Sequence, residues 1–295
     1  MFKNLDPSAL GGEGHQSEIL ELALTYGFRG VDLNIVEFAG RVKLHGMTYA
    51  KRTLASAKIR VGTFALPPDW DSDDEVFKRQ VEVLTEYARI AAELGCTRAL
   101  CWISPAGDKR PYHENFEFHK RRFADICRIL EPAGIRLGVG VRAVESLRKG
   151  RAFQFIHNLD ALLLLLNMVG LPNLGVLVDV WDLWLSGATI DSIRGLSPRQ
   201  IVAVHLADLP ADVPPAEITE TQRLLPGATG RIDCVGVLTA LGELGYDGPV
   251  TIKADRTAYE STRRDRMARQ AAEILDKLWK AARLTPDGKL APVAT

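Results

Sequence analysis

The feature that most constrains the fold is the regular alternation of strand-like and helix-like segments over 295 residues. Short β-branched and apolar runs predict strands at residues 1–5, 30–35, 60–66, 97–103, 135–141, 174–180, 201–208 and 249–255. Longer amphipathic patterns between and after them predict helices at 16–26, 47–57, 73–95, 114–132, 158–169, 189–195, 233–244 and 261–282. Strict alternation of this kind predicts a parallel sheet.

The number and size of these units favour a closed barrel. Eight strand–helix pairs in 295 residues suit a (β/α)8 barrel, which typically needs about 250 residues. An open doubly wound sheet is the alternative, but no GxGxxG follows the first strand. The third helix has a start signal, because Ser72 followed by Glu75 is typical of a capping box. We expect one (β/α)8 barrel over residues 1–283 and a loosely held tail over 284–295.

The charge balance and the cysteines exclude several classes of protein. Lys+Arg and Asp+Glu each number 37, and a chain without net positive charge is not typical of a nucleic-acid binder. The start has no signal-peptide pattern, and the longest apolar run, near 161–166, is too short to span a bilayer. The four cysteines are far apart and form no CxxC motif, which is typical of reduced thiols. We therefore expect a cytoplasmic protein with neither a membrane nor a nucleic-acid partner.

Two late strands place a polar side chain inside the predicted barrel. Active sites of such barrels lie where the strands end, at the C-terminal face. Alternation along the strands places Asp179 and His205 on the interior face. The apolar residues that we expect to face the helices are Leu174, Val176, Val178, Val180, Val202, Val204 and Leu206.

Other strand ends contribute further groups to the same mouth. Alternation along 135–142 leaves Gly138, Gly140 and Arg142 on the interior side. Lys253 ends the last strand on the face opposite Val250 and Ile252. Lysine is almost never fully buried unless it is paired, so this residue needs a partner or a function. The tryptophans at strand ends are Trp102 and Trp181.

Several stretches together carry a family resemblance. They are FALPPDW (64–70), CWISPAGDKRPYHENFEFHKRR (101–122), GIRLGVGV (134–141), PNLGVLVDVWDLWLSGAT (172–189), IVAVHLAD (201–208), RLLPGATGRID (223–233) and LGYDGPVTIK (244–253). In these stretches the chain resembles the xylose-isomerase-like TIM barrels, also called sugar phosphate isomerases/epimerases. The resemblance implies a divalent metal held by Glu, Asp, His and Glu from strands five to eight, and the two glutamates move a proton in the epimerases.

Position by position, this chain departs from that ligand set. The Asp and the His are present as Asp179 and His205, but the two glutamates fall on Gly140 and Lys253. A histidine that often touches substrate, three residues after the Asp, falls on Asp182. Half of the metal ligands and both proton-moving carboxylates are therefore missing.

Lys253 has two interpretations. Its ammonium can stand in for the missing cation and pair with Asp179, because a buried carboxylate without a partner is costly. Alternatively, a desolvated lysine with a lowered pKa can act as a base or a Schiff-base nucleophile, together with His205. We expect no cofactor. A weakly bound Mn, Mg, Co or Zn ion is the alternative, with Asp182, Asp208 or Glu145 as replacement ligands.

These observations lead to two functional hypotheses. The first is a carbohydrate-binding homologue that has lost the metal-dependent activity. The second is an active isomerase, epimerase or lyase that uses Lys253 and His205. In both, the ligand is a small carbohydrate-like molecule, and the candidate binding residues are Trp102, Arg142, Trp181 and Asp182. The resemblance is also compatible with a homodimer.

Overall fold

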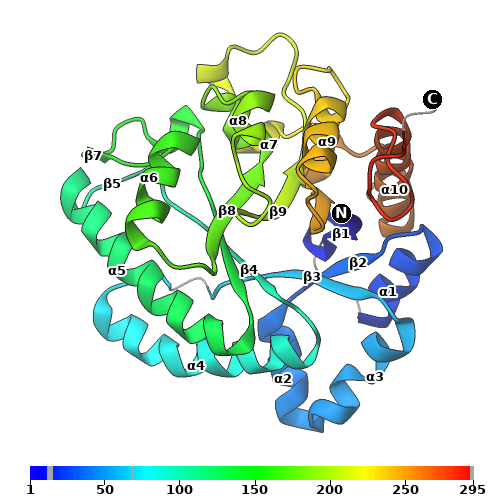
Figure 1. Ribbon diagram of the computed structural model, residues 1–295, viewed down its shortest axis with the longest axis horizontal. Helices are drawn as coiled ribbons and strands as arrows, with labels where there is room; N and C mark the ends of the chain where they lie inside the picture. Colours follow the sequence, from blue (N-terminus) through cyan, green and yellow to red (C-terminus); the bar gives the residue numbers. More distant parts are fainter. Residues whose placement is uncertain (12–15, 68–69, 293–295) are drawn as a thin grey trace.

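The computed structural model describes residues 1–11, 16–67 and 70–292, and these form a closed parallel barrel surrounded by helices (Figure 1). The barrel strands are β1 (Phe2–Leu5), β2 (Gly30–Leu33), β3 (Arg60–Ala65), β4 (Arg98–Trp102), β6 (Arg136–Gly140), β8 (Leu174–Asp179), β9 (Ile201–Leu206) and β10 (Pro249–Ile252). Each strand pairs in parallel with its neighbour, and β1 closes the barrel on β10 through the register Phe2↔Pro249. The predicted (β/α)8 fold is confirmed.

The helices follow the predicted pattern, with two additions. They are α1 (Gln16–Thr25), α2 (Ile35–His45), α3 (Met47–Ala57), α4 (Asp74–Glu93), α5 (Tyr112–Leu130), α6 (Leu159–Val169), α7 (Val180–Leu185), α8 (Ile190–Arg194), α9 (Cys234–Glu243) and α10 (Arg264–Ala281). The sequence did not indicate α2 or α7. Each begins directly after a strand, where a side-chain oxygen of Asn34 or Asp179 accepts a hydrogen bond from the helix N-terminus.

The start of α4 differs from the prediction. Its N-cap residue is Asp73, whose side chain makes no capping hydrogen bond. The prediction that Ser72 is the N-cap residue of a capping box with Glu75 is therefore wrong, because the helix begins one residue later. Two acidic residues, Asp74 and Glu75, occupy the first turn, where they interact favourably with the helix dipole.

The barrel interior contains a small apolar cluster, formed by Leu100, Leu177, Val202 and Ala203 with Trp102 packed against it. Val202 was expected to face the helices, and that expectation is wrong. Val176 pairs with Ile201 but Leu177 pairs with Ala203, so Val202 is the extra residue of a β-bulge. The bulge breaks the alternation, and Val202 turns inward against Gly138.

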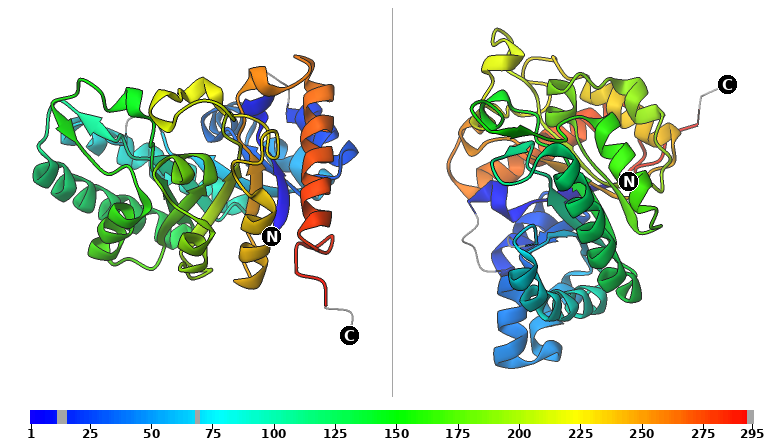
Figure 2. Two further views of the ribbon diagram at one scale, coloured as in Figure 1. Left: turned by 90° about the horizontal axis from the view of Figure 1, so that it is seen from above. Right: turned by 90° about the vertical axis from the view of Figure 1, so that its left-hand side faces the viewer.

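The segment that follows α10 lies beside the start of β1 at one end of the barrel (Figure 2). The Met1 amine donates to the carbonyls of Tyr246, at 3.0 Å, and Gly288, at 3.2 Å. Leu284 and Leu290 form an isolated antiparallel bridge. Residues 284–292 of the expected tail are therefore held by contacts, and the domain boundary at residue 283 stays a prediction.

Two further expectations concern the chain as a whole. All four cysteines are free, as predicted, and all four are buried. Within the described ranges, no helix is both long enough and apolar enough to cross a bilayer.

Candidate functional site

A half-buried arginine binds two buried carboxylates, one at the end of β8 and one in α7. Arg223 Nη1 donates to Asp179 Oδ1 at 3.0 Å and Oδ2 at 2.9 Å, and Nη2 donates to Asp182 Oδ2. The guanidinium carbon lies 4.3 Å from the centre of the Trp181 ring. The other oxygen of Asp182 accepts a hydrogen bond from the Ala143 amide at 2.8 Å. These contacts hold the guanidinium in a fixed orientation.

The pKa values of the two carboxylates are shifted in opposite directions from the ordinary value of an aspartate. Burial raises the pKa of Asp179, but Arg223 and His205 outweigh that effect and hold the pKa well below its usual value. Burial and the neighbouring Asp179 raise the pKa of Asp182 to about 7. Burial lowers the pKa of Arg223, yet both carboxylates outweigh it, so the guanidinium stays charged.

Lys253 does not pair with Asp179, and that prediction is wrong. Its Nζ forms an ion pair with Asp6 and donates to Ser8 Oγ at 3.0 Å. Both partners follow β1, which is the neighbour of β10 in the barrel. Burial lowers the pKa of Lys253, but Asp6 outweighs it, and the pKa lies above its ordinary value. Lys253 is therefore an ammonium and not a neutral base.

The residues present do not fit the metal that the fold family implies. A Cβ at Gly140 would lie 2.9 Å from Trp102 Cδ1 and 3.1 Å from Leu177 Cδ2, so the indole occupies the space of the missing glutamate. The guanidinium of Arg223 binds the carboxylate that a cation would need. Over the part of the chain that the structure describes, no group of three His, Cys, Asp or Glu residues is arranged to hold a metal ion.

The proposed replacement ligands are also engaged. Asp208 accepts hydrogen bonds from four backbone amides, at 2.8–3.0 Å, which hold the loop after β9. Glu145 pairs with Arg148 at 3.0 Å. Asp182 is bound to Arg223, as described above. These side chains therefore have structural partners.

A cavity of about 450 Å³ opens beside this cluster, on the side of β1, β2 and β3. Its polar lining includes Asp6, Ser8, Asp32, Thr63, His205 and Lys253, and its aromatic lining includes Phe64 and Trp102. The centres of the Trp102 and His205 rings are 6.1 Å apart. The cavity therefore combines a flat apolar surface with hydrogen-bonding groups, as in pockets for polar small molecules.

The other predicted binding residues lie away from this cavity. Trp181 is fully buried beneath Arg223, and Asp182 is buried as well. Arg142 is half exposed and pairs with Glu220 at 3.6 Å, not with Glu145. His205 lines the cavity and also faces Asp179, with 3.6 Å between Nδ1 and Oδ2. The structure thus brings Trp102, His205 and Lys253 together around the cavity and separates Arg142, Trp181 and Asp182 from it.

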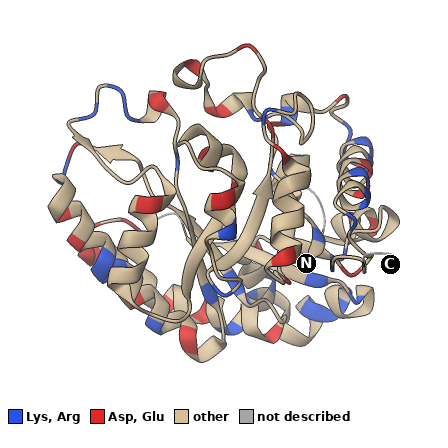
Figure 3. Ribbon diagram, turned by 45° about the horizontal axis from the view of Figure 1, so that its top comes forward, with Lys and Arg blue, Asp and Glu red and all other residues tan. Residues whose placement is uncertain are grey.

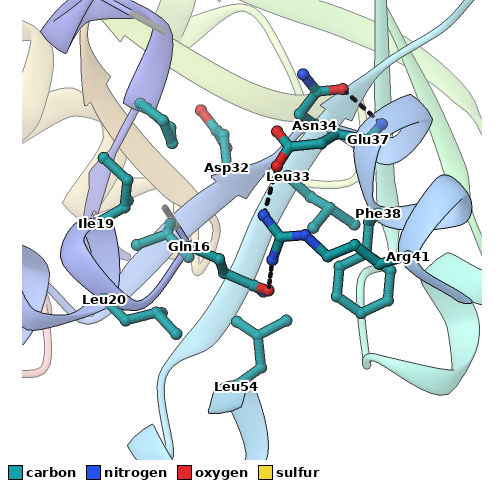
Figure 4. A pocket seen from close by; sticks show the side chains of 12 residues that line it. Gln16, Ile19, Leu20, Asp32, Leu33, Asn34, Glu37, Phe38, Arg41 and Leu54 are labelled. Carbon is teal, nitrogen blue, oxygen red and sulfur yellow. Dashed lines mark hydrogen bonds and ion pairs between the residues drawn. The ribbon is translucent and has the colours of Figure 1, made fainter. Parts of the chain in front are cut away.

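Asp32 is the main cavity residue that the sequence analysis missed. Its Oδ1 accepts hydrogen bonds from Asn4 Nδ2 at 2.8 Å, the Thr63 amide at 2.8 Å and Thr63 Oγ1 at 2.7 Å. Asp32 also lines a second, smaller cavity between β2 and the helices α1 and α2 (Figure 4). Strand alternation would have found it, because Val31 and Leu33 flank it in the second predicted strand. Arg223 carries no comparable signal, since it lies in a loop.

The comparisons with known proteins agree with this architecture. A family model described as xylose isomerase-like TIM barrel matches residues 20–278. Inosose isomerases from Bacillus velezensis and Bacillus subtilis are 28% and 26% identical over 112 and 135 residues. These matches cover 38% and 46% of this chain, and they span less than half of each relative, 39% and 45%.

Two solved structures share the whole barrel. A xylose isomerase domain protein from Alicyclobacillus acidocaldarius superimposes with a TM-score of 0.86 at 28% identity, over 96% of this chain and 99% of that one. The IOLI protein with a bound zinc atom superimposes with a TM-score of 0.77 over 96% of this chain and 98% of that one. Its identity of 17% supports the shared fold alone.

Proposed function

The chain belongs to the xylose isomerase-like TIM barrel family, and from this premise we propose that it binds a sugar-like carbonyl compound in its mouth cavity without a divalent metal. In this proposal it does not carry out the metal-dependent reaction in which two glutamates move a proton. The positions of those glutamates are Gly140 and Lys253, and neither can supply a carboxylate.

The observation that carries the proposal is the contact of Arg223 with both Asp179 and Asp182. A planar guanidinium forms bidentate hydrogen bonds with carboxylates and stays charged at all physiological pH values. A divalent cation at Asp179 would have to displace this group and would be repelled by it. The local charge that a metal supplies in relatives is therefore supplied here by a side chain.

The class of ligand is argued from the cavity and from the relatives. Polar groups of Asp32, His205 and Lys253 can hydrogen-bond to hydroxyl and carbonyl oxygens, and the Trp102 indole offers a flat face to an apolar ring face. The curated relatives are named inosose isomerases, and an inosose is a cyclic polyhydroxy ketone. We therefore place polyhydroxy ketones first among the ligands to test.

The interpretation of Lys253 as a proton acceptor, with His205 as its partner, has less support. A lysine base must lose its proton near neutral pH, whereas the pairing with Asp6 raises the pKa of Lys253. The expected homodimer and the cytoplasmic location stay predictions.

Elemental analysis of the purified protein, with a thermal shift series over Mg, Mn, Co, Ni and Zn, tests the metal part of the proposal. We expect no stoichiometric metal and no stabilisation by any of these ions. The variant Arg223→Met removes the guanidinium from Asp179 and is measured beside the wild type, because stabilisation by Mn²⁺ or Zn²⁺ in this variant alone would show that the arginine excludes the ion. Stoichiometric metal in the wild-type protein would contradict the proposal.

Calorimetric titration with inosose and with D-fructose tests the ligand part. We expect at least one of the two to bind in the presence of EDTA. Trp102→Leu removes the indole face and should weaken that binding about tenfold, which corresponds to roughly 1.4 kcal/mol. Arg142 lies outside the cavity, so Arg142→Met serves as the matched control. The affinity of this variant for the ligand should equal that of the wild type. If Trp102→Leu bound the ligand as tightly as the wild type, the ligand would not contact Trp102, and this would contradict the assigned site.

A further inference from the structure

We propose that Asp32 and Lys253 form a metal-free proton-transfer pair in the mouth cavity. The Asp32 carboxylate removes a proton from the carbon next to the ligand's carbonyl group, and the Lys253 ammonium stabilises the enolate oxygen that results. The inference rests on the proposed function, because it requires a carbonyl compound in this cavity. It goes further, because it assigns a reaction and two roles that differ from those of the missing glutamates.

The orientation of Asp32 is the first step of the argument. Three donors hold its Oδ1, at 2.7–2.8 Å, and they come from β1 and β3 on either side of β2. Over the described residues its Oδ2 accepts no hydrogen bond, and Asp32 lines the cavity. One oxygen is thus fixed by the barrel, and the other is available to a ligand. This arrangement suits a positioned base.

The charges around Asp32 leave it able to accept and to return a proton. Burial and the carboxylate of Asp6 raise its pKa to about 6, against the opposing effects of Thr63, His205 and Asn4. The arginine of α2, Arg41, donates to Gln16 and Glu37 and not to Asp32 (Figure 4). A carboxyl group with such a pKa is mostly ionised at pH 7 and is still basic enough for proton transfer.

The position of Lys253 is the second step. Asp6 and Ser8 fix its ammonium at the wall of the same cavity, and the charge of Asp32 also contributes to its raised pKa. An ammonium donates hydrogen bonds and carries a full positive charge, so it can stabilise the negative charge that develops on a carbonyl oxygen. In this inference Asp6 is a positioning residue, because it acts only through Lys253.

The reaction balances without a further reactant. The C–H bond next to the carbonyl breaks, its proton passes to Asp32 Oδ2, and its electron pair forms a C=C bond. The carbonyl oxygen becomes an enolate oxygen that Lys253 holds by a hydrogen bond. If the proton returns to the same carbon, the result is exchange. If it returns to the former carbonyl carbon, the result is isomerisation, and the hydroxyl proton on the neighbouring carbon then moves to the enolate oxygen. Because one base serves one face, we expect proton exchange and isomerisation, and not epimerisation.

The test is the wash-in of deuterium from D₂O at carbons next to the carbonyl of inosose and of D-fructose, followed by NMR in the presence of EDTA. We expect exchange with the wild-type protein. Asp32→Asn keeps the shape and the Oδ1 hydrogen bonds, and it should slow exchange on the order of a hundredfold or more. Lys253→Met should slow it as well. Glu117→Gln, which removes a carboxylate on α5 that pairs with Lys120 and does not line the cavity, is the matched control and should leave exchange unchanged.

Calorimetric binding measurements on the same samples separate the two proposals. A probe that binds the wild type without exchanging would overturn the inference and leave the proposed function intact. Exchange that persists in Asp32→Asn would overturn the role of Asp32. Failure of both probes to bind would contradict the proposed function.

A ligand-free measurement then tests the inference by itself. The carboxyl carbon of Asp32, followed by ¹³C NMR against Asp32→Asn, should titrate near pH 6. A midpoint near the ordinary value of an aspartate, about 4, would contradict the raised basicity of Asp32, and its role would then depend on the exchange measurements alone.

Discussion

Two cation–carboxylate groups organise the residues at the barrel mouth. Arg223 binds Asp179 and Asp182, and Lys253 binds Asp6. The first group is closed, because the guanidinium uses its donors on buried carboxylates. The second borders the cavity, and the side chain of Lys253 is 32% exposed. The first group therefore stabilises the fold, and the second is accessible to a ligand.

The cost of removing Arg223 can be compared with that of a surface arginine. Arg223→Met leaves two carboxylates buried without their cation, and loss of one partner of a buried pair typically costs about 3–5 kcal/mol. Arg142→Met breaks a half-exposed pair with Glu220 and should cost less than about 1 kcal/mol. Urea unfolding of both variants at pH 7 measures the difference. Equal losses would show that Arg223 does not stabilise the fold.

Asp32 makes stability depend on pH in an unusual direction. Its pKa is about 6 in the folded protein and 3.8 in the unfolded chain, so between these values the folded state binds more protons. Stability therefore falls as pH rises from about 4 to about 6, by at most about 3 kcal/mol. Asp32→Asn cannot titrate, and its unfolding free energy should lack this loss. Urea unfolding of the wild type and of Asp32→Asn at pH 5 and pH 7 measures the change in unfolding free energy between these pH values. An equal change in the two proteins would contradict the prediction.

Pairs of neighbouring strands determine what each position can hold. Gly140 at the end of β6 lies against Trp102 at the end of β4, and the two are paired in register. The indole of Trp102 fills the space that a side chain at position 140 would need. A glutamate introduced at position 140 would therefore collide with the indole unless the ring moved.

A single added methyl group tests this contact. Gly140→Ala places a Cβ 2.9 Å from the indole, and such overpacking typically costs about 1–3 kcal/mol. Gly107→Ala in β5 (Ala106–Gly107) is the matched control, because an added Cβ there meets nothing within 4 Å. Thermal unfolding of both variants, and of Gly140→Ala combined with Trp102→Leu, measures the effect. The second substitution should recover part of the loss, and no recovery would contradict the assigned contact.

The whole molecule carries no net charge, with 37 basic and 37 acidic residues. Figure 3 shows both signs intermixed over the helices that surround the barrel. A surface of this kind lacks the single-sign field that attracts nucleic acid.

Binding and solubility measurements check this charge balance. We expect no retention on a heparin column at 100 mM salt. The lowest solubility in polyethylene glycol should lie near the pI of about 7.0, because charge repulsion between molecules is smallest there. Retention on heparin would contradict this prediction and would indicate a basic patch on the surface.

The sequence predicted the strands and the interior positions of Asp179, His205 and Gly140, because strand alternation is a local property that one segment carries by itself. The same rule, applied to the second strand, would have found Asp32. It failed at Val202, where a β-bulge adds one residue to β9, and pairing with β8 creates that bulge.

The ion pairs were decided by the tertiary structure. Lys253 and Asp6 are 247 residues apart in the sequence, and they meet because β10 closes the barrel on β1. Arg223 reaches Asp179 from a loop that lies at the mouth, where a bridge between Asp208 and Leu224 and a hydrogen bond from the Asp255 amide to the Arg223 carbonyl hold it. The sequence alone thus determined the barrel, and it placed a glycine and a lysine where the family resemblance implies two glutamates. Which cation neutralises which carboxylate depended on chain closure and on the path of one loop, because electrostatic partners are selected by distance in space.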